Sequence, residues 1–221
     1  MLVSLSKHYC PTKFQYARRR LPASLLRILD VGCGNHSPTL TKTWFPRSHY
    51  TGADVQNYNT DKADLAAMDA FFPLGFDGSG YTELPDKSYD FIILNHVVEH
   101  ILDPKPVLVT LCSKLKPGGF IWIAFPSLRS LSLPSADGTL QFCDDPTHVF
   151  VPDIREISNI LLANGLSVIH AGRTRDALRT LIGLAILPWA LLKKMTTGKL
   201  TVGLWSLAGF EDHVFGQRRL S

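Results

Sequence analysis

The sequence lacks several features that mark common functional classes. It has four cysteines, which are Cys10, Cys33, Cys112 and Cys143. These cysteines stand far apart and form no CxxC pair, which argues against a zinc ribbon or a disulfide framework and fits a reducing compartment. The N-terminal stretch MLVSLSKHYCPTKF has no apolar core of the length that a signal peptide needs. We therefore expect a cytoplasmic protein.

Charge is also scarce, at 19% of residues against 45% apolar ones, which is a globular composition. The net charge of +4 comes partly from Arg18-Arg19-Arg20 and Arg218-Arg219. Neither cluster is interleaved with aromatic residues along a stripe, so we expect solvated surface and no nucleic-acid partner. A length of 221 residues suits one α/β domain, or one domain with an appendage.

No apolar run reaches the roughly 20 residues of a membrane-spanning helix. The nearest is Ala177–Leu192, which contains Arg179 and Pro188 and is followed by Lys193-Lys194. Three interpretations stay open for this segment. In the first, it is a helix that completes the core or a dimer face. In the second, it is a cap over the substrate entrance or an interfacial helix. In the third, it is a true membrane span. The second gives peripheral contact with the inner face of a membrane through residues 177–194. The oligomeric state stays open.

The chain instead alternates apolar runs of strand length with helical stretches, which is typical of a parallel sheet with helices on both faces. The predicted strands are Leu25–Val31, His49–Ala53, Ala63–Met68, Asp90–Leu94, Phe120–Phe125, Leu166–His170 and Asp212–Gly216. One helix is predicted from Asp103-Pro104 through the stripe Leu108, Leu111 and Leu115 to Gly118-Gly119. Another spans Pro152–Ala163. Phe72–Pro85 and Ser127–Val151 are predicted as loops.

The first predicted strand ends in the glycine turn Asp30-Val31-Gly32-Cys33-Gly34. Glycines let the chain turn tightly and let a ligand approach the backbone, although an ordinary strand-to-helix loop has the same pattern. Asp54 lies twenty residues after Gly34, at the end of the second predicted strand, where an acid binds ribose hydroxyls in such folds. Together the two features predict a nucleoside-type cofactor.

The residue three positions after Gly34 is Ser37, where a dinucleotide fold needs a third glycine. That glycine lets a pyrophosphate reach the helix N-terminus. S-adenosylmethionine has no phosphate, so it does not need this glycine. A nicotinamide-dependent oxidoreductase is therefore the disfavoured alternative.

Six segments in order resemble the class I S-adenosylmethionine-dependent methyltransferases, in their type 11 small-molecule branch. They are LDVGCG (Leu29–Gly34), GADV (Gly52–Val55), Met68–Ala70, Leu84–Asp90, Asn95–His100 and Leu115–Gly119. The resemblance covers about residues 25–170. One departure is His36, because the family often has a glycine at that position.

The resemblance implies an α/β fold, a Rossmann-like doubly wound sheet of seven strands with the last one antiparallel and an apolar helical insertion before it. Residues 1–221 then form a single methyltransferase domain, whose parts are a cofactor-binding half (25–125), a substrate loop (127–151) and the apolar insertion (172–209). The implied cofactor is S-adenosyl-L-methionine. We expect the acceptor to be a small molecule, a saccharide or a lipid-like compound. A domain of this fold that binds cofactor or a partner without catalysis stays open as the alternative.

The resemblance also implies the members of the cofactor site. They are Asp30, Gly32 and Gly34 around the methionine part, Asp54 on the ribose hydroxyls, Val55 on the adenine, Asp69 and Ala70 at the adenine amino group, and Asn95 near the methyl group.

Asp144–Val149 contains a D-P-x-H segment that type 11 relatives share, although a plain polar turn fits equally. Histidine is well matched to proton transfer at neutral pH, so His148 is predicted as general base, oriented by Asp145. Methyl transfer can also proceed by positioning alone, without a base.

The segment His96–His100 fits the HxxEH pattern of inverted zinc peptidases, which would place two histidines four residues apart on a helix. A peptidase needs a distant third ligand, and the flanking segments are methyltransferase-like. We expect no metal site, and we expect His100 to pack or cap.

Overall fold

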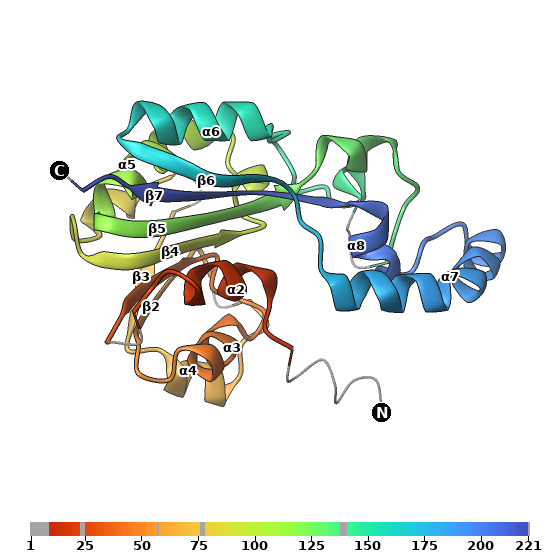
Figure 1. Cartoon of the computed structure of the whole chain (residues 1–221), viewed down its shortest axis with the longest axis horizontal. Helices are drawn as coiled ribbons and strands as arrows, with labels where there is room; N and C mark the ends of the chain where they lie inside the picture. Colours follow the sequence, from red (N-terminus) through yellow and green to blue (C-terminus); the bar gives the residue numbers. More distant parts are fainter. Residues whose placement is uncertain (1–8, 23–24, 57, 76–77, 138–140, 221) are drawn as a thin grey trace.

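The computed structural model describes residues 9–22, 25–56, 58–75, 78–137 and 141–220, which form one seven-stranded sheet in the order β3-β2-β1-β4-β5-β7-β6 (Figure 1). The strands are β1 (Arg27–Val31), β2 (His49–Asp54), β3 (Ala70–Pro73), β4 (Tyr89–Asn95), β5 (Leu115–Pro126), β6 (Leu166–Arg173) and β7 (Glu211–Arg218). β7 runs antiparallel to both of its neighbours, and the pairs among β1 to β5 are parallel. The predicted seven-stranded sheet with an antiparallel last strand is confirmed.

Helices connect the strands. The α-helices are α2 (Thr12–Arg18), α3 (Ser37–Trp44), α4 (Lys62–Ala67), α5 (Pro104–Lys114), α6 (Ile154–Ala163), α7 (Ala177–Thr197) and α8 (Trp205–Ala208). The 3-10 helices are η1 (Tyr81–Glu83), η2 (Val98–His100), η3 (Leu128–Ser132), η4 (Phe142–Asp144) and η5 (Val202–Leu204). The side chains of Asp103 and Asp153 accept backbone N–H groups at the starts of α5 and α6, which fixes where these helices begin.

Alternate residues of the central strands pack on opposite faces of the sheet. Ile28 belongs to an apolar cluster with α2, whereas its neighbour Leu29 belongs to a cluster with α5 and α6. Figure 1 shows α2 and α3 below the sheet and α5 and α6 above it. Burial on both faces explains why β1 and β4 are continuous apolar runs in the sequence.

The prediction of a third strand at Ala63–Met68 is wrong, because residues 62–67 form α4. Asp61 caps this helix, since its Oδ1 accepts the N–H groups of Ala63 and Asp64 while Asp64 Oδ2 accepts the Asp61 N–H, a capping box. The strand comes later, as β3. The predicted loop Phe72–Pro85 therefore starts inside β3, and its residues 76–77 lie outside the described residues.

The predicted end of the helix after β4 is also misplaced. α5 stops at Lys114, and Leu115 already pairs with Tyr89 as the first residue of β5. Gly118-Gly119 therefore lie within β5 instead of ending the helix. In the predicted loop Ser127–Val151, only η3 and η4 form regular helical turns among the described residues; Gly138 lies outside them.

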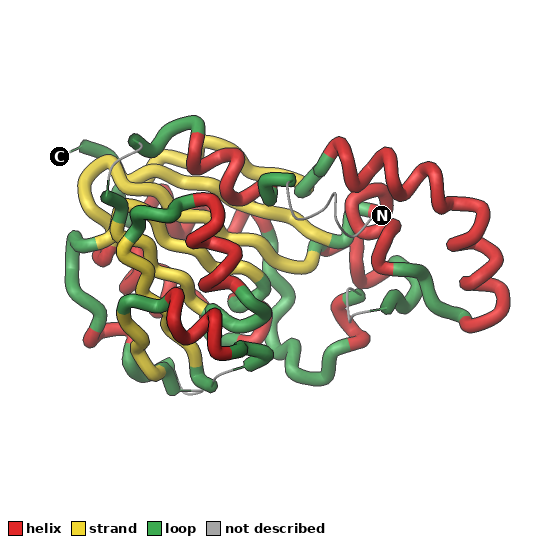
Figure 2. The backbone as a smooth tube through the Cα atoms, turned by 90° about the horizontal axis from the view of Figure 1, so that it is seen from below, coloured by secondary structure: helices red, strands yellow, loops and turns green. Residues whose placement is uncertain are grey.

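The predicted apolar insertion is α7, η5 and α8, which lie beyond the end of the strands (Figures 1 and 2). These helices share a small core of their own, made by Ala136, Ala190, Leu200, Leu204 and Phe210. We call α7, η5 and α8 the apical lobe. None of the helices in the described ranges has the length and hydropathy that crossing a membrane would take.

Candidate functional site

The predicted cofactor residues of β1, β2 and β4 meet at one edge of the sheet. Val31 pairs with Ala53 on β2 and with Leu94 on β4, so the residues directly after these pairs are neighbours. Gly32, Asp54 and Asn95 are therefore brought together at the carboxyl edge, where ligands bind in open α/β sheets.

The glycine turn has no room for side chains. Gly32 has φ +69°, and a Cβ there would lie 2.4 Å from Cγ2 of Val97; a Cβ on Gly34 would lie 2.6 Å from the carbonyl oxygen of Tyr58. The Gly32 N–H donates to the Ala53 carbonyl at 2.8 Å, which fixes the turn against β2. The turn therefore packs closely against Val97 and Tyr58, and only residues without a Cβ fit at these two positions.

Asp30 lies beneath the turn and is fully buried. Its Oδ2 accepts the hydroxyls of Ser37 at 2.6 Å and Tyr50 at 2.9 Å. Burial raises the pKa of this carboxyl group, while Lys13 and the two hydroxyls act in the opposite direction. Asp30 therefore anchors the start of α3. The residue that it binds there, Ser37, stands where a dinucleotide-binding fold has its third glycine.

Asp54 is half-buried at the end of β2, with its Oδ1 accepting the N–H groups of Val55 at 2.7 Å and Gln56 at 3.4 Å. Burial raises its pKa, and the backbone N–H groups of Gln56, Val55 and Gly34 lower it. These bonds hold the carboxylate still, and its remaining lone pairs can accept two hydroxyls. A bare backbone turn beside a fixed carboxylate fits the amino acid part and the ribose of S-adenosylmethionine. Val55 is half-buried against the core.

Asp69 and Ala70 are not brought to this edge. Ala70 pairs with Thr51 at the start of β3, whereas it is Pro73 that pairs with Asp54. Asp69 Oδ2 instead accepts Lys42 Nζ at 2.6 Å and the Tyr50 N–H at 2.7 Å. The sequence predicts the third strand at Ala63–Met68, so Asp69 and Ala70 are expected at its carboxyl end. In the structure the strand is Ala70–Pro73, and both residues lie at its amino end.

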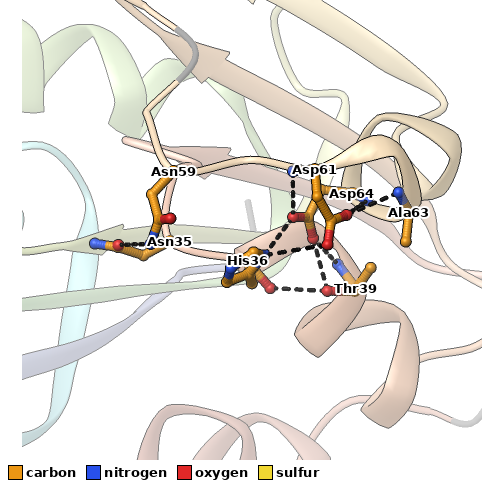
Figure 3. A network of polar contacts seen from close by, with 7 residues as sticks. All are labelled: Asn35, His36, Thr39, Asn59, Asp61, Ala63 and Asp64. Carbon is orange, nitrogen blue, oxygen red and sulfur yellow. Dashed lines mark hydrogen bonds and ion pairs between the residues drawn. The ribbon is translucent and has the colours of Figure 1, made fainter.

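His36 stands where the resembling family often has a glycine, and it keeps the backbone that glycine favours, with φ +57°. Figure 3 shows the contacts that support it: His36 Nδ1 lies 2.6 Å from Asp64 Oδ2, and Thr39 Oγ1 donates to Asp64 Oδ1 at 2.7 Å. The buried Asp64 carboxylate thus ties the start of α3 to α4. His36, Asp61 and Asp64 place possible ligand atoms within 4.8 Å of one another, and these hydrogen bonds account for that proximity.

A groove of about 400 Å³ opens beside Asn95. Its walls come from the ends of β4 and β7 and from the apical lobe. The lining residues are Asn95, His96, Arg179, Ile182, Gly203, Trp205, Ser206 and Glu211. Sequence reasoning singled out only Asn95 as a site residue here, because the others become neighbours only when α7 and β7 fold back to β4.

His96 is the histidine of the HxxEH pattern that faces this groove. The helix that a zinc site of this pattern would need does not form, because His96 has φ +58° and Val98–His100 make only a 3-10 turn. Its Nδ1 lies 3.1 Å from Glu99 Oε1 and its Nε2 lies 2.7 Å from Glu211 Oε2. Burial lowers the pKa of His96, but the hydrogen bonds and charges of the two glutamates outweigh burial and raise it to about 10.

His148 and Asp145 lie together but do not line the groove. The His148 Nδ1–H donates to the Phe142 carbonyl at 2.7 Å, and Nε2 lies 3.9 Å from Asp145 Oδ2. The ring packs between Phe142 and His100, each with a centroid distance of 4.8 Å. Hydrogen bonds from Thr147 lower the pKa of Asp145 against the effect of burial. Both residues stay a prediction.

His100 packs against His148, one of the two roles expected for it, and its Nδ1 lies 2.9 Å from Thr147 Oγ1. Glu99, His100 and His148 also place possible ligand atoms within 4.8 Å of one another.

Comparison with known proteins adds the family. The chain matches the methyltransferase domain family over residues 6–171, a match that ends before α7. It is 26% identical over 176 residues to the ubiquinone biosynthesis O-methyltransferase of Rhizobium rhizogenes, which covers 76% of this chain and 71% of that protein. It is 29% identical over 181 residues to the protein of the same name from Bartonella bacilliformis, with 72% of each chain covered.

Solved structures share the fold. A SAM-dependent methyltransferase from Archaeoglobus fulgidus superposes with a TM-score of 0.58 at 17% identity, over 97% of this chain and 94% of the other. An S-adenosylmethionine-dependent methyltransferase from Mesorhizobium loti gives a TM-score of 0.60 at 15% identity, over 94% and 98%.

Proposed function

Because this chain belongs to the methyltransferase domain family and is a class I S-adenosylmethionine-dependent methyltransferase of the small-molecule type, we propose that it methylates a hydroxyl group of a small amphipathic acceptor. The observation that carries the proposal is the groove beside Asn95. It lies at the carboxyl edge that holds the cofactor residues, and it combines polar groups with the apolar surface of Ile182 and Trp205.

The residues divide into two roles in this proposal. Gly32, Gly34 and Asp54 hold the cofactor, with Asp30 acting from beneath through α3, Val55 packing on the adenine and Asn95 lying near the transferred methyl group. The bound cofactor supplies a methyl group on a positively charged sulfur. A hydroxyl acceptor is favoured because the curated relatives are named O-methyltransferases.

We further propose that the acceptor is lipid-like and that the apical lobe contacts a membrane surface. Six large apolar side chains of α7 are half or more exposed, and they are Leu181, Leu184, Trp189, Leu191, Leu192 and Met195. Most of them recur at helical spacing on one face. The helix also carries Arg179, Lys193 and Lys194 and no acidic residue, so its surface suits an anionic interface.

Methyl transfer is tested with tritiated S-adenosylmethionine and cell extract fractionated by polarity. We expect label in the fraction that partitions into organic solvent. Label in the polar fraction alone would favour a saccharide acceptor instead. Binding of S-adenosylmethionine without label in any fraction would contradict the transferase proposal and favour a binding protein of this fold.

Membrane contact is tested by flotation with vesicles of phosphatidylglycerol and of phosphatidylcholine. We expect binding to the anionic vesicles only, and a loss of binding in the double variant Leu191→Asp/Leu192→Asp. A matched control is Leu162→Asp, which places the same charge on an exposed leucine of α6. Equal binding of both variants, or none by the unmodified protein, would contradict the contact.

A further inference from the structure

The backbone of His96 is in a rare conformation at the point where β4 leaves the sheet. Its φ of +58° lies in the left-handed region, which few residues other than glycine adopt. Its N–H still donates to the Ala124 carbonyl at 2.9 Å, so the residue is anchored to β5. This strain lies directly after Asn95, beside the predicted position of the methyl group, and the His96 side chain lines the groove.

Both ring nitrogens of His96 face carboxylates. Neutral imidazole has a single N–H, so hydrogen bonds to two ionised carboxylates, those of Glu99 and Glu211, require the doubly protonated ring. The raised pKa of His96 agrees with this protonation state. With both nitrogens donating, His96 has no lone pair with which to accept a proton from an acceptor molecule.

Among the described residues that line the groove, Glu211 is the remaining one whose side chain can accept a proton. It is the first residue of β7, only 5% exposed, and its Oε2 accepts the His96 Nε2–H. A carboxylate can accept further hydrogen bonds, so Glu211 can also receive a hydroxyl. The other charged groups near it are Glu99 behind His96 and Arg179 across the groove, while Asp212 lies on the alternate face of β7.

We propose that Glu211 is the proton acceptor of the reaction and that His96 is its positioning residue; this proposal rests on the proposed function. The acceptor oxygen forms its bond to the methyl carbon while the carbon–sulfur bond breaks and its electron pair stays on sulfur. The hydroxyl proton passes to the Glu211 carboxylate. The His96 imidazolium keeps that carboxylate ionised and aimed into the groove before the step.

The predicted base His148 is placed less well for this task. Its ring is packed between Phe142 and His100, and its Nδ1–H donates to the Phe142 carbonyl. It does not belong to the described residues that line the groove. Glu211 does, and it approaches the groove from the strand next to β5.

The test uses initial rates with saturating S-adenosylmethionine and a fixed amount of the organic-solvent extract as acceptor. Glu211→Gln keeps the shape but removes the proton acceptor, so we expect a rate loss of about 100-fold or more with the Kd for S-adenosylmethionine within twofold. Glu156→Gln, the same change on the exposed surface of α6, is the matched control and keeps the full rate. Glu211→Asp, which retracts the carboxylate, replaces Glu211→Gln in this test if the glutamine variant does not fold.

The pH profile separates positioning from a structural effect. We expect the rate of the unmodified protein to fall on the acidic side, where Glu211 becomes protonated, and this limb to vanish in Glu211→Gln. In His96→Gln the limb moves to higher pH, because a positive charge beside the carboxylate is lost.

Full activity of Glu211→Gln, or a loss confined to His148→Asn, overturns the proposal while leaving the transferase assignment intact. Absence of methyl transfer by the unmodified protein contradicts the proposed function itself, and this proposal with it.

Discussion

Asp54 and Asp69 have the same chemistry and each comes after an apolar stretch, yet they lie at opposite edges of the sheet. Asp54 ends β2 beside the glycine turn, whereas Asp69 precedes β3 and binds Lys42. A residue's role here depends on which end of a parallel strand it occupies, because only the carboxyl ends form the ligand edge.

We expect Asp54→Asn to weaken S-adenosylmethionine binding about 10- to 100-fold, since hydrogen bonds to a charged group contribute about 1.5–3 kcal/mol. Asp69→Asn should leave the Kd within twofold. Isothermal titration calorimetry measures both. A larger effect at Asp69 than at Asp54 would show that the adenine lies elsewhere than this geometry indicates.

The free energy of unfolding depends on pH through His96 and the two glutamates that it contacts, Glu99 and Glu211. Its pKa is raised in the folded protein, to about 10, above the ordinary value of 6.5. The stabilisation from His96 is therefore complete below about pH 6.5 and is lost as the pH rises through about 10.

The difference in urea midpoint between the unmodified protein and His96→Gln should accordingly be largest near pH 6 and shrink toward pH 10. Chemical unfolding followed by circular dichroism at several pH values measures it. A difference that stays constant over this range would mean that the ring is neutral in the folded protein.

At the scale of elements, α4 formed where a strand was predicted because of its cap. Ala63–Met68 contains enough apolar residues for a strand, but the Asp61–Asp64 capping box satisfies the first free N–H groups of a helix. The same Asp64 carboxylate contacts His36, which directly precedes α3, and Thr39 in the first turn of α3 (Figure 3). One buried side chain thus links the starts of α3 and α4.

We expect Asp64→Asn to lower the free energy of unfolding by about 1–3 kcal/mol at neutral pH, because several donors lose a buried, charged acceptor. Burial acts to raise the pKa of Asp64, but hydrogen bonds from Thr39, Asp61 and His36 lower it to about 2. The stabilisation is present above about pH 4 and is lost as the pH falls through 2.

Urea unfolding at pH 7 and pH 2.5 measures both effects of Asp64. The difference in free energy of unfolding between the unmodified protein and Asp64→Asn should be smaller at pH 2.5 than at pH 7. Asp137→Asn, at a carboxylate that binds Lys193 in the apical lobe, is the comparison and should cost less, because partly exposed ion pairs contribute at most about 1 kcal/mol. An equal loss of unfolding free energy in Asp64→Asn and Asp137→Asn would contradict the inference that burial strengthens the contacts of Asp64.

At the scale of the whole molecule, the apical lobe has its own small core but is joined to the sheet by direct hydrogen bonds. The Ser127 N–H donates to the Phe210 carbonyl and its hydroxyl to the Gly209 carbonyl, each at 2.8 Å. The Thr174 N–H donates to the Glu211 carbonyl at 3.0 Å. The groove lies across this junction, so its geometry depends on the lobe staying docked.

We therefore expect the lobe and the sheet to unfold together as a single domain of residues 1–221. Differential scanning calorimetry should show one transition, with a calorimetric enthalpy equal to the van't Hoff value. S-adenosylmethionine should raise its Tm as a whole. A separate transition at lower temperature that the cofactor does not shift would show that the lobe folds independently.

The sequence by itself determined the α/β fold class and indicated a nucleoside-type cofactor. Continuous apolar runs predicted strands buried on both faces, and Gly32, Gly34 and Asp54 marked the carboxyl edge because their spacing is set by one strand–helix–strand unit. Local patterns of this kind carry enough information, since the residues involved are close in the chain. The resemblance added the antiparallel last strand.

Only the tertiary structure forms the groove in which we propose that the acceptor binds. The groove joins His96 to Glu211, 115 positions apart, and no periodicity or spacing connects residues so distant. The placement of Asp69 failed for a related reason, because a capping box turned one predicted strand into a helix and moved the third strand to Ala70–Pro73. The glycine turn could be recognised locally, but the chemistry beside it depends on how β7 returns between β5 and β6.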